Sequence, residues 1–317
     1  AARLALDKRR IGEQRHGHRL QRQRDAQLAH HVGLAVEIEV ISDPAKTALV
    51  FDRAIPVLGT EDVAATPGKP DELGAALALH SLAEATRYCL LGASAGLVTA
   101  PIGKAQLAKV GFEYPGQTEF LAEVCGLAPD EAVMMLAGPS LRAVPLTVHC
   151  ALADVPGRLS QELITRRARI VAAALTRDFG IADPRIAVCG LNPHAGENGR
   201  FGDEEARIIA PAIETLVTEG IAVTGPHPAD ALFTPRARQT YDAALAMYHD
   251  QALVPLKALD FDEGVNVTLG LPIVRTSPDH GTAFDIAGRG LAEPGAMIAA
   301  LKMAGEIAAR RKHALAG

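Results

Sequence analysis

The chain has 317 residues, 48% of them hydrophobic and 22% charged, which is typical of a soluble α/β protein with a large core divided between two domains. The formal net charge of −5 gives no indication of nucleic-acid binding, and no apolar stretch has the roughly 18 residues of a membrane span. Four widely spaced cysteines without a CxxC pair, and a basic start without a signal-peptide core, favour free thiols and a cytoplasmic location.

Residues 1–33 form an atypical basic segment. Residues 1–25 contain eight Lys or Arg against three Asp or Glu, with few apolar positions. This segment cannot form a buried central strand, because burying even one unpaired charge costs several kcal/mol. We expect residues 7–31 to lie outside the sheet, as a solvated helix or a poorly ordered arm. A nucleic-acid-binding arm is disfavoured because no aromatic side chain is interleaved with the basic ones.

From residue 34 onward, short apolar runs typical of buried strands alternate with longer helical patterns. The expected strands are 34–41, 97–101, 132–138, 143–149, 186–190 and 243–249, and the runs 264–270 and 273–290 follow them. The expected helices are 71–89, one opening near 118, 155–179, 203–219 and a closing alanine-rich helix. This order predicts an α/β fold with a mostly parallel sheet covered by helices on both faces.

The loop after strand 186–190 is the most distinctive stretch of the chain. It reads LNPHAGENGRFG, contains Asn192, His194 and three glycines, and leads into a helix with an acidic first turn. A strand–loop–helix unit places its loop at the carboxyl edge of a parallel sheet, where α/β proteins bind ligands. A ligand-binding loop and an ordinary connector are both consistent with this pattern.

Three histidines each lie at or just beyond the end of an expected strand: His149, His194 and His249. Strand ends converge on one edge of a parallel sheet, so the three imidazoles could bind one divalent cation. Three protein ligands with an open position are typical of a catalytic metal site. Asp250 could orient one ligand. The alternative, that these are three unrelated polar residues at strand ends, stays open.

Residues suited to anions and to a nucleotide follow in the last quarter of the chain. Lys257, Asn266 and Arg275 fit an anionic substrate, because arginine clamps a phosphate or carboxylate and lysine supplies a charge or a proton. The loop DHGTAFDIAGRG contains Asp285, Gly288 and Gly290, and its aspartate could bind the ribose hydroxyls of a nucleotide. No GxGxxG follows an early strand, so a Rossmann dinucleotide site is not indicated.

Taken together, these motifs resemble the 4-hydroxythreonine-4-phosphate dehydrogenase family of vitamin B6 synthesis. The resemblance runs from about residue 34 to the end and rests on LVTAPIGK, YPGQTEF, GLNPHAGENG, PADALF, AMYHDQALVPLK and GVNVTLGLPIVRTSPDHGTA. HGTAFDIAGRG also resembles the cofactor loop of isopropylmalate and isocitrate dehydrogenases, whose two-domain fold the family shares. We therefore expect residues 34–130 with 271–317 to form a cofactor-side domain, and residues 131–270 a metal, substrate and dimerisation domain.

The resemblance also implies an activity and a site. His149, His194 and His249 match the family's metal ligands, in a site shared across a homodimer with the cleft between domains. Its substrate contacts correspond to Gln117, Thr118, Lys257, Asn266 and Arg275. The implied reaction oxidises 4-phosphohydroxy-L-threonine with NAD, or NADP, and decarboxylates it to 3-amino-2-oxopropyl phosphate, with Lys257 transferring a proton. The metal could be Zn, Mg or Co.

Two departures from the family's pattern leave alternatives open. The family has His where this chain has Gln117, and glutamine cannot carry a proton or charge. Nothing in residues 1–33 matches the family's glycine-rich first loop, which suggests an altered reading frame or native divergence. The alternatives are a sister dehydrogenase of a phosphorylated four-carbon hydroxy acid such as phospho-threonate, and an inactive binding homologue with a damaged N-terminus.

Overall fold

The computed structural model describes residues 37–59, 63 and 66–316. The expectation for residues 1–33 therefore lies outside the described residues. The chain divides into two compact units, one of Ala1–Ala78 with Ala283–Ala292 and one of Leu79–Thr282 with Glu293–Gly317. These boundaries differ from the division expected near residues 130 and 270, which stays a prediction.

In the first unit, the described residues form a small parallel β-pair. Strand β1 (Ile38–Ile41) pairs with β2 (Ile55–Leu58), and between them lie a 3-10 turn (Pro44–Lys46) and the short helix α2 (Thr47–Val50). Ile41, Val50 and Ala54 form their core. The expected strand 34–41 is thus present from Ile38 to Ile41. A second 3-10 turn, Phe284–Ile286, belongs to this unit as well.

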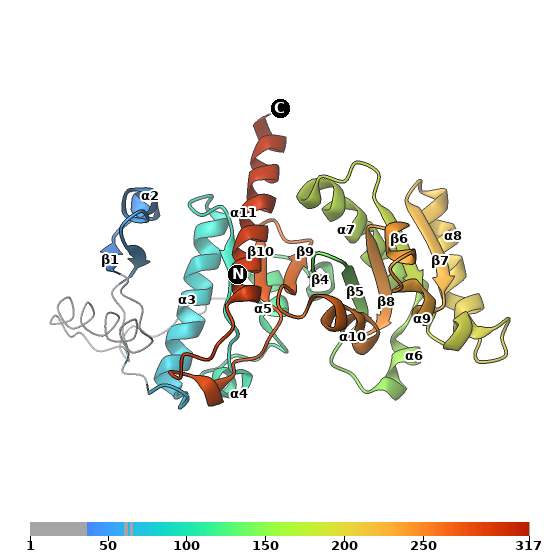
Figure 1. Ribbon diagram of the computed structural model, residues 1–317, viewed down its shortest axis with the longest axis horizontal. Helices are drawn as coiled ribbons and strands as arrows, with labels where there is room; N and C mark the ends of the chain where they lie inside the picture. Colours follow the sequence, from blue (N-terminus) through green and yellow to red (C-terminus); the bar gives the residue numbers. More distant parts are fainter. Residues whose placement is uncertain (1–36, 60–62, 64–65, 317) are drawn as a thin grey trace. The chain divides into compact units, whose positions relative to one another are not determined.

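The second unit is built on one eight-stranded sheet with the order β3-β10-β9-β4-β5-β8-β6-β7 (Figure 1). Its strands are β3 (Leu97–Val98), β4 (Val133–Ala137), β5 (Arg142–Thr147), β6 (Arg185–Cys189), β7 (Ala222–His227), β8 (Ala243–Tyr248), β9 (Val265–Leu269) and β10 (Arg275–Pro278). Strands β5, β8, β6 and β7 run parallel, as do β3 and β10. Strand β4 is antiparallel to both β5 and β9, and β9 is antiparallel to β10. The predicted α/β fold with a largely parallel sheet is confirmed. Two of the three antiparallel pairs, β4–β5 and β9–β10, join consecutive strands that no helix separates, and the third, β4–β9, joins these two hairpins.

Helices cover this sheet as the strand pattern predicts. They are α3 (Glu72–Leu90, which contains the boundary between the units), α4 (Lys104–Lys109), α5 (Gln117–Val124), α6 (Val155–Arg158), α7 (Gln161–Phe179), α8 (Ala210–Thr218), α9 (Ala229–Leu232), α10 (His249–Asp260) and α11 (Gly295–Ala316). The expected helix 155–179 is interrupted, because Leu159 and Ser160 are extended and the Ser160 side chain accepts from Leu163 N to begin α7. No helix in the described part of the chain is both long and apolar enough to span a membrane.

Alternate side chains of the strands point into two separate cores. Met135, Val144, Val188 and Leu245 pack on one face, in the core that also contains buried residues of α7, α8 and α11. Their sequence neighbours Leu136, Ala143, Ala187 and Ala244 pack on the other face with residues of α9 and α10. This period of two is the geometry of a pleated strand buried on both faces, and it decides which side chains reach the site described next.

Candidate active site

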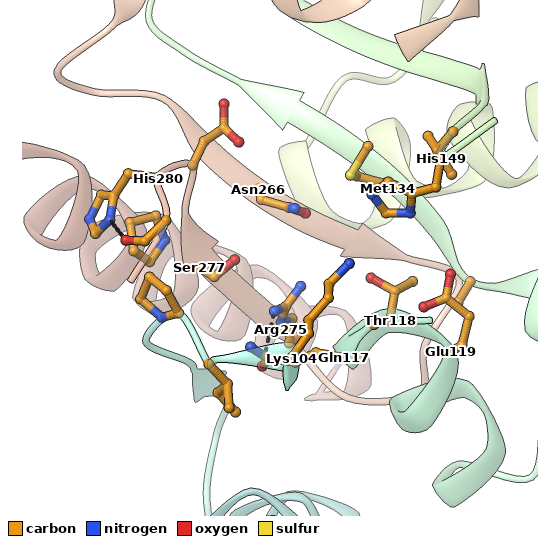
Figure 2. A pocket seen from close by; sticks show the side chains of 18 of the residues that line it. Lys104, Gln117, Thr118, Glu119, Met134, His149, Asn266, Arg275, Ser277 and His280 are labelled. Atoms are coloured by element: carbon orange, nitrogen blue, oxygen red, sulfur yellow. Dashed lines mark hydrogen bonds between the residues drawn. The ribbon is translucent and has the colours of Figure 1, made fainter. Parts of the chain in front are cut away.

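A cavity of about 490 Å³ lies in the second unit, on the α10 face of β4, β9 and β10. Pairing in the sheet aligns Ser277 with Asn266 and Asn266 with Leu136, so side chains two residues along each strand share this face. Met134, Asn266, Arg275 and Ser277 line the cavity (Figure 2). Thr276, between the last two, points to the opposite face, where its hydroxyl donates to the Ala300 carbonyl of α11 at 2.9 Å.

Arg275 forms the buried floor of this cavity. Only 4% of the residue is exposed, and its guanidinium donates to Thr268 Oγ1 at 3.0 Å, Thr99 Oγ1 at 2.9 Å and Gln117 Oε1 at 3.3 Å. All three acceptors are neutral, and Nε has no partner among the described residues. Burial lowers the pKa of Arg275 to about 10. A buried cation without a carboxylate in hydrogen-bond contact is suited to receive an anionic ligand.

The first turn of α5 supplies a second set of lining side chains. Gly116 is its N-cap in extended conformation, so Thr118 lies inside the first turn. Gln117, Thr118 and Glu119 line the cavity together with Lys104, the first residue of α4. Figure 2 shows Lys104 and Gln117 beside Arg275. Gln117 also donates from Nε2 to the Ala100 carbonyl at 3.3 Å, which orients its Oε1 toward Arg275.

Lys257 lies on α10 next to the cavity wall. Its Nζ is 3.7 Å from Oδ2 of Asp279, and Asp279 lines the cavity while Lys257 itself does not. Burial raises the pKa of the Asp279 carboxyl, although the Lys257 charge opposes this. The sequence analysis did not single out Asp279 or Ser277. Both lie within the quoted run RTSPDHGTA, but only the antiparallel pairing of β10 with β9 places them on the cavity face.

Two of the three strand-end histidines lie together at this cavity. His149 and His249 both line it, and their ring centroids are 6.3 Å apart. Nδ1 of His249 is 2.6 Å from Asp250 Oδ1, which leaves Nε2 free for a ligand. Burial, with a smaller contribution from the Lys104 charge, lowers the pKa of His149 and so favours the neutral imidazole that metals require. A second cavity, of about 410 Å³, shares both histidines.

The third histidine, His194, lies elsewhere in the second unit. It is exposed on the loop after β6, with its ring centroid 6.2 Å from that of Phe201. No group of three His, Cys, Asp or Glu side chains among the described residues of one chain is arranged to hold a metal ion. Zn–N bonds of about 2 Å put each ring centroid roughly 3 Å from a shared ion, so two histidines on one tetrahedral ion have centroids about 5 Å apart. The His149–His249 separation of 6.3 Å exceeds this by roughly 1 Å, which a small rotation of the side chains can close. These two imidazoles fit two positions of a metal site, and the three-histidine set stays a prediction.

Comparison with known proteins identifies the family. The family model described as pyridoxal phosphate biosynthetic protein PdxA matches residues 16–304. The chain belongs to the PdxA family. This confirms the resemblance inferred from the motifs, and the match begins within the basic segment, earlier than the start expected near residue 34. The part of the basic segment from residue 16 onward therefore matches the family model.

Several named relatives cover most of the chain. The 4-hydroxythreonine-4-phosphate dehydrogenase of Erythrobacter litoralis is 66% identical over 283 residues, 89% of this chain and 84% of the relative. That of Zymomonas mobilis subsp. mobilis is 52% identical over 279 residues, 88% of this chain and 83% of the relative. The crystal structure of the Klebsiella pneumoniae 4-hydroxythreonine-4-phosphate dehydrogenase matches with a TM-score of 0.79 and 38% identity, covering 89% of this chain and 85% of that one.

The nucleotide-loop residues of this PdxA family member are in the other unit. Asp285, Gly288 and Gly290 belong to the first unit, whereas every residue lining the 490 Å³ cavity belongs to the second. Asp285 is exposed within the turn Phe284–Ile286, and both glycines have positive φ, 74° and 67°. Their role in nucleotide binding stays a prediction.

Proposed function

We propose that this protein is a dehydrogenase that oxidises 4-phosphohydroxy-L-threonine with NAD and decarboxylates it to 3-amino-2-oxopropyl phosphate. The observation that carries the proposal is Arg275, a guanidinium that is 4% exposed and is bonded to neutral groups at the floor of the cavity. Such a group matches the phosphate of this substrate. The names of the relatives, which are 66% and 52% identical, support the same assignment. In this proposal the cofactor is NAD or NADP, and the protein is cytoplasmic.

Side chains in and beside the cavity have separate roles in substrate binding and in proton transfer. Arg275, Thr118, Asn266 and Gln117 would hold the phosphate and the polar groups of the substrate. Lys257, beside Asp279, would move the proton that returns to the substrate carbon after CO₂ departs. When bound, NAD accepts the hydride, and a divalent cation such as Zn, Mg or Co stabilises negative charge on substrate oxygens.

The metal site requires a third ligand in addition to His149 and His249. We propose that His194 of a second copy supplies it, so that each site of a homodimer contains histidines from both chains. Two features support this: His194 is exposed, and within one chain the described residues form no three-ligand group. An exposed histidine on a loop is suited to complete the site of a partner.

The test is NADH production by the purified protein with 4-phosphohydroxy-L-threonine and added Zn, Mg or Co. Turnover that requires both substrate and metal is expected. Phospho-threonate in the same assay distinguishes a sister dehydrogenase, which would turn over the hydroxy acid faster than the amino acid. Metal and phosphate binding without turnover of either compound would identify an inactive binding homologue and overturn the proposal.

A further inference from the structure

The loop that contains His194 has an unusual backbone. Six consecutive residues, 194–199, have φ between 43° and 88°, and only two of them are glycines. L-residues avoid this left-handed region because Cβ approaches the following carbonyl oxygen. We call residues 190–204 the His194 loop. Its conformation must be imposed by contacts outside the left-handed run.

Glu205 provides these contacts. It is 6% exposed and lies at the start of a single π-helical turn, Glu205–Ile209, that leads into α8. Its Oε1 accepts from the backbone N–H of Asn192 at 2.7 Å, and its Oε2 accepts from Asn192 Nδ2 at 3.0 Å. The same Nδ2 also donates to Oε2 of the neighbouring Glu204 at 2.7 Å. Glu205 therefore joins the beginning of the His194 loop to the helix that follows the loop, and so closes it.

The left-handed run also packs directly on this carboxylate. A Cβ added to Gly196 would lie 2.7 Å from Glu205 Oε2, and one added to Gly190 would lie 3.2 Å from Oε1 and 2.8 Å from the Ala195 Cα. In the part of the chain that the structure describes, Glu205 forms no salt bridge with Lys or Arg. A buried carboxylate needs hydrogen-bond donors, and here both donors belong to Asn192.

We propose that Glu205 is a positioning residue for His194: it holds the His194 loop in the left-handed conformation that presents the imidazole to the metal. This inference rests on the proposed function, in which His194 is a metal ligand. Groups that orient metal ligands without touching the metal change affinity by about 10- to 100-fold when mutated. Glu205→Gln keeps the size of the side chain, but its amide nitrogen cannot accept from Asn192.

The experiment measures binding of Zn²⁺ alone to the metal-free, full-length protein by calorimetric titration. We expect Glu205→Gln to raise the Kd about 10- to 100-fold. The matched control is Glu197→Gln, in the same loop, whose carboxylate is exposed and has Arg200 as its ion-pair partner at 3.8 Å. The control should bind like the wild type. Asn192→Ala keeps the backbone N–H that donates to Oε1, so it should cause a smaller loss of Zn²⁺ affinity. If Glu205→Gln does not fold, Asn192→Ala replaces it in the titration.

A second measurement separates positioning from general stability. Hydrogen exchange of the amides of residues 194–199 in the metal-free protein should be faster in Glu205→Gln than in the wild type and in Glu197→Gln. Wild-type Zn²⁺ affinity in both Glu205→Gln and Asn192→Ala would overturn the inference while the proposed metal site stands. A wild-type protein that binds no Zn²⁺ would instead overturn the metal site itself and this inference with it.

Discussion

Gln251 joins the two segments that lead to His249 and His194. Its Nε2 donates to the carbonyl oxygen of Gly190, at the start of the His194 loop, at 2.8 Å. Its Oε1 accepts from the backbone N–H of Met247 at 2.6 Å, one residue before the end of β8. Gln251 is 8% exposed, so one buried amide fixes the end of β8 against the end of β6.

Gln251→Leu should therefore destabilise the protein strongly. It leaves a buried N–H and a buried C=O without partners, and each such loss costs about 1–3 kcal/mol, for a total of roughly 2–6 kcal/mol. The measurement is denaturant unfolding of the metal-free protein. Gln161→Leu is the control, because that side chain is exposed and its bond to the Arg207 carbonyl is 3.2 Å; its effect should stay within about 0.5 kcal/mol. Equal stability of the two variants would contradict the role assigned to Gln251.

Arg275→Ala and Lys257→Ala should affect different kinetic constants. A phosphate clamp acts in the ground state and the transition state alike, so Arg275→Ala should mainly raise KM, by about thirtyfold for a loss of about 2 kcal/mol. A proton donor acts as the barrier is crossed, so Lys257→Ala should mainly lower kcat. Arg169→Ala, which removes an exposed partner of Glu219, is the control for loss of a charge. The reverse pattern, with kcat lowered by Arg275→Ala and KM raised by Lys257→Ala, would exchange the two roles.

A metal site shared between two chains can be tested by mixing inactive variants. His149→Ala and His194→Ala should each lose metal and activity as purified homodimers. If His194 completes the partner's site, a heterodimer of the two variants contains one intact site and one doubly damaged site. Random reassociation should then restore activity to about a quarter of the wild-type value, because half the dimers are mixed. Heterodimers verified by mass spectrometry that stay inactive would show that the ligands come from one chain.

Asp279→Asn should make the protein more stable at neutral pH while impairing catalysis. Burial raises the pKa of Asp279 in the folded protein, so the ionised carboxylate is less favourable there than in the unfolded chain. The protonated carboxyl of Asp279 favours folding. This contribution is fully present below the pKa of the unfolded chain, about 4, and is lost as the pH rises through the pKa of the folded protein. Asparagine avoids that loss, so the gain should be largest near pH 7 and should shrink toward pH 4.

Unfolding midpoints across this pH range measure the effect of Asp279→Asn. Asp203→Asn, on an exposed carboxylate 3.4 Å from Arg207, is the control and should show no such trend. A variant that is less stable than the wild type at every pH would mean that the Lys257 ion pair outweighs the burial of the carboxylate.

The apolar pattern of the sequence placed most strands but missed β2 and β7, whose residues are mostly exposed or half-buried. All of β8 except Tyr248 is buried, and adjacent residues of β4 enter opposite cores, so continuous apolar runs were required wherever both faces of the sheet are covered. The break at Leu159 was not visible in the pattern, because an apolar residue followed by Ser160 fits a continuing helix as well as a new start.

Residue types at strand ends determined which chemistry the chain could support, and the fold decided which of them meet. His149 and His249 lie together because β5 and β8 are adjacent parallel strands with Thr147 opposite Tyr248. His194 follows a strand of the same sheet, yet a left-handed run held by Glu205 sets its direction, and no spacing rule encodes that. The burial of Arg275 and the placement of Asp279 follow from the antiparallel register of β10 on β9. Such a register joins residues by hydrogen bonds across the sheet, and the order of residues along one strand does not specify it.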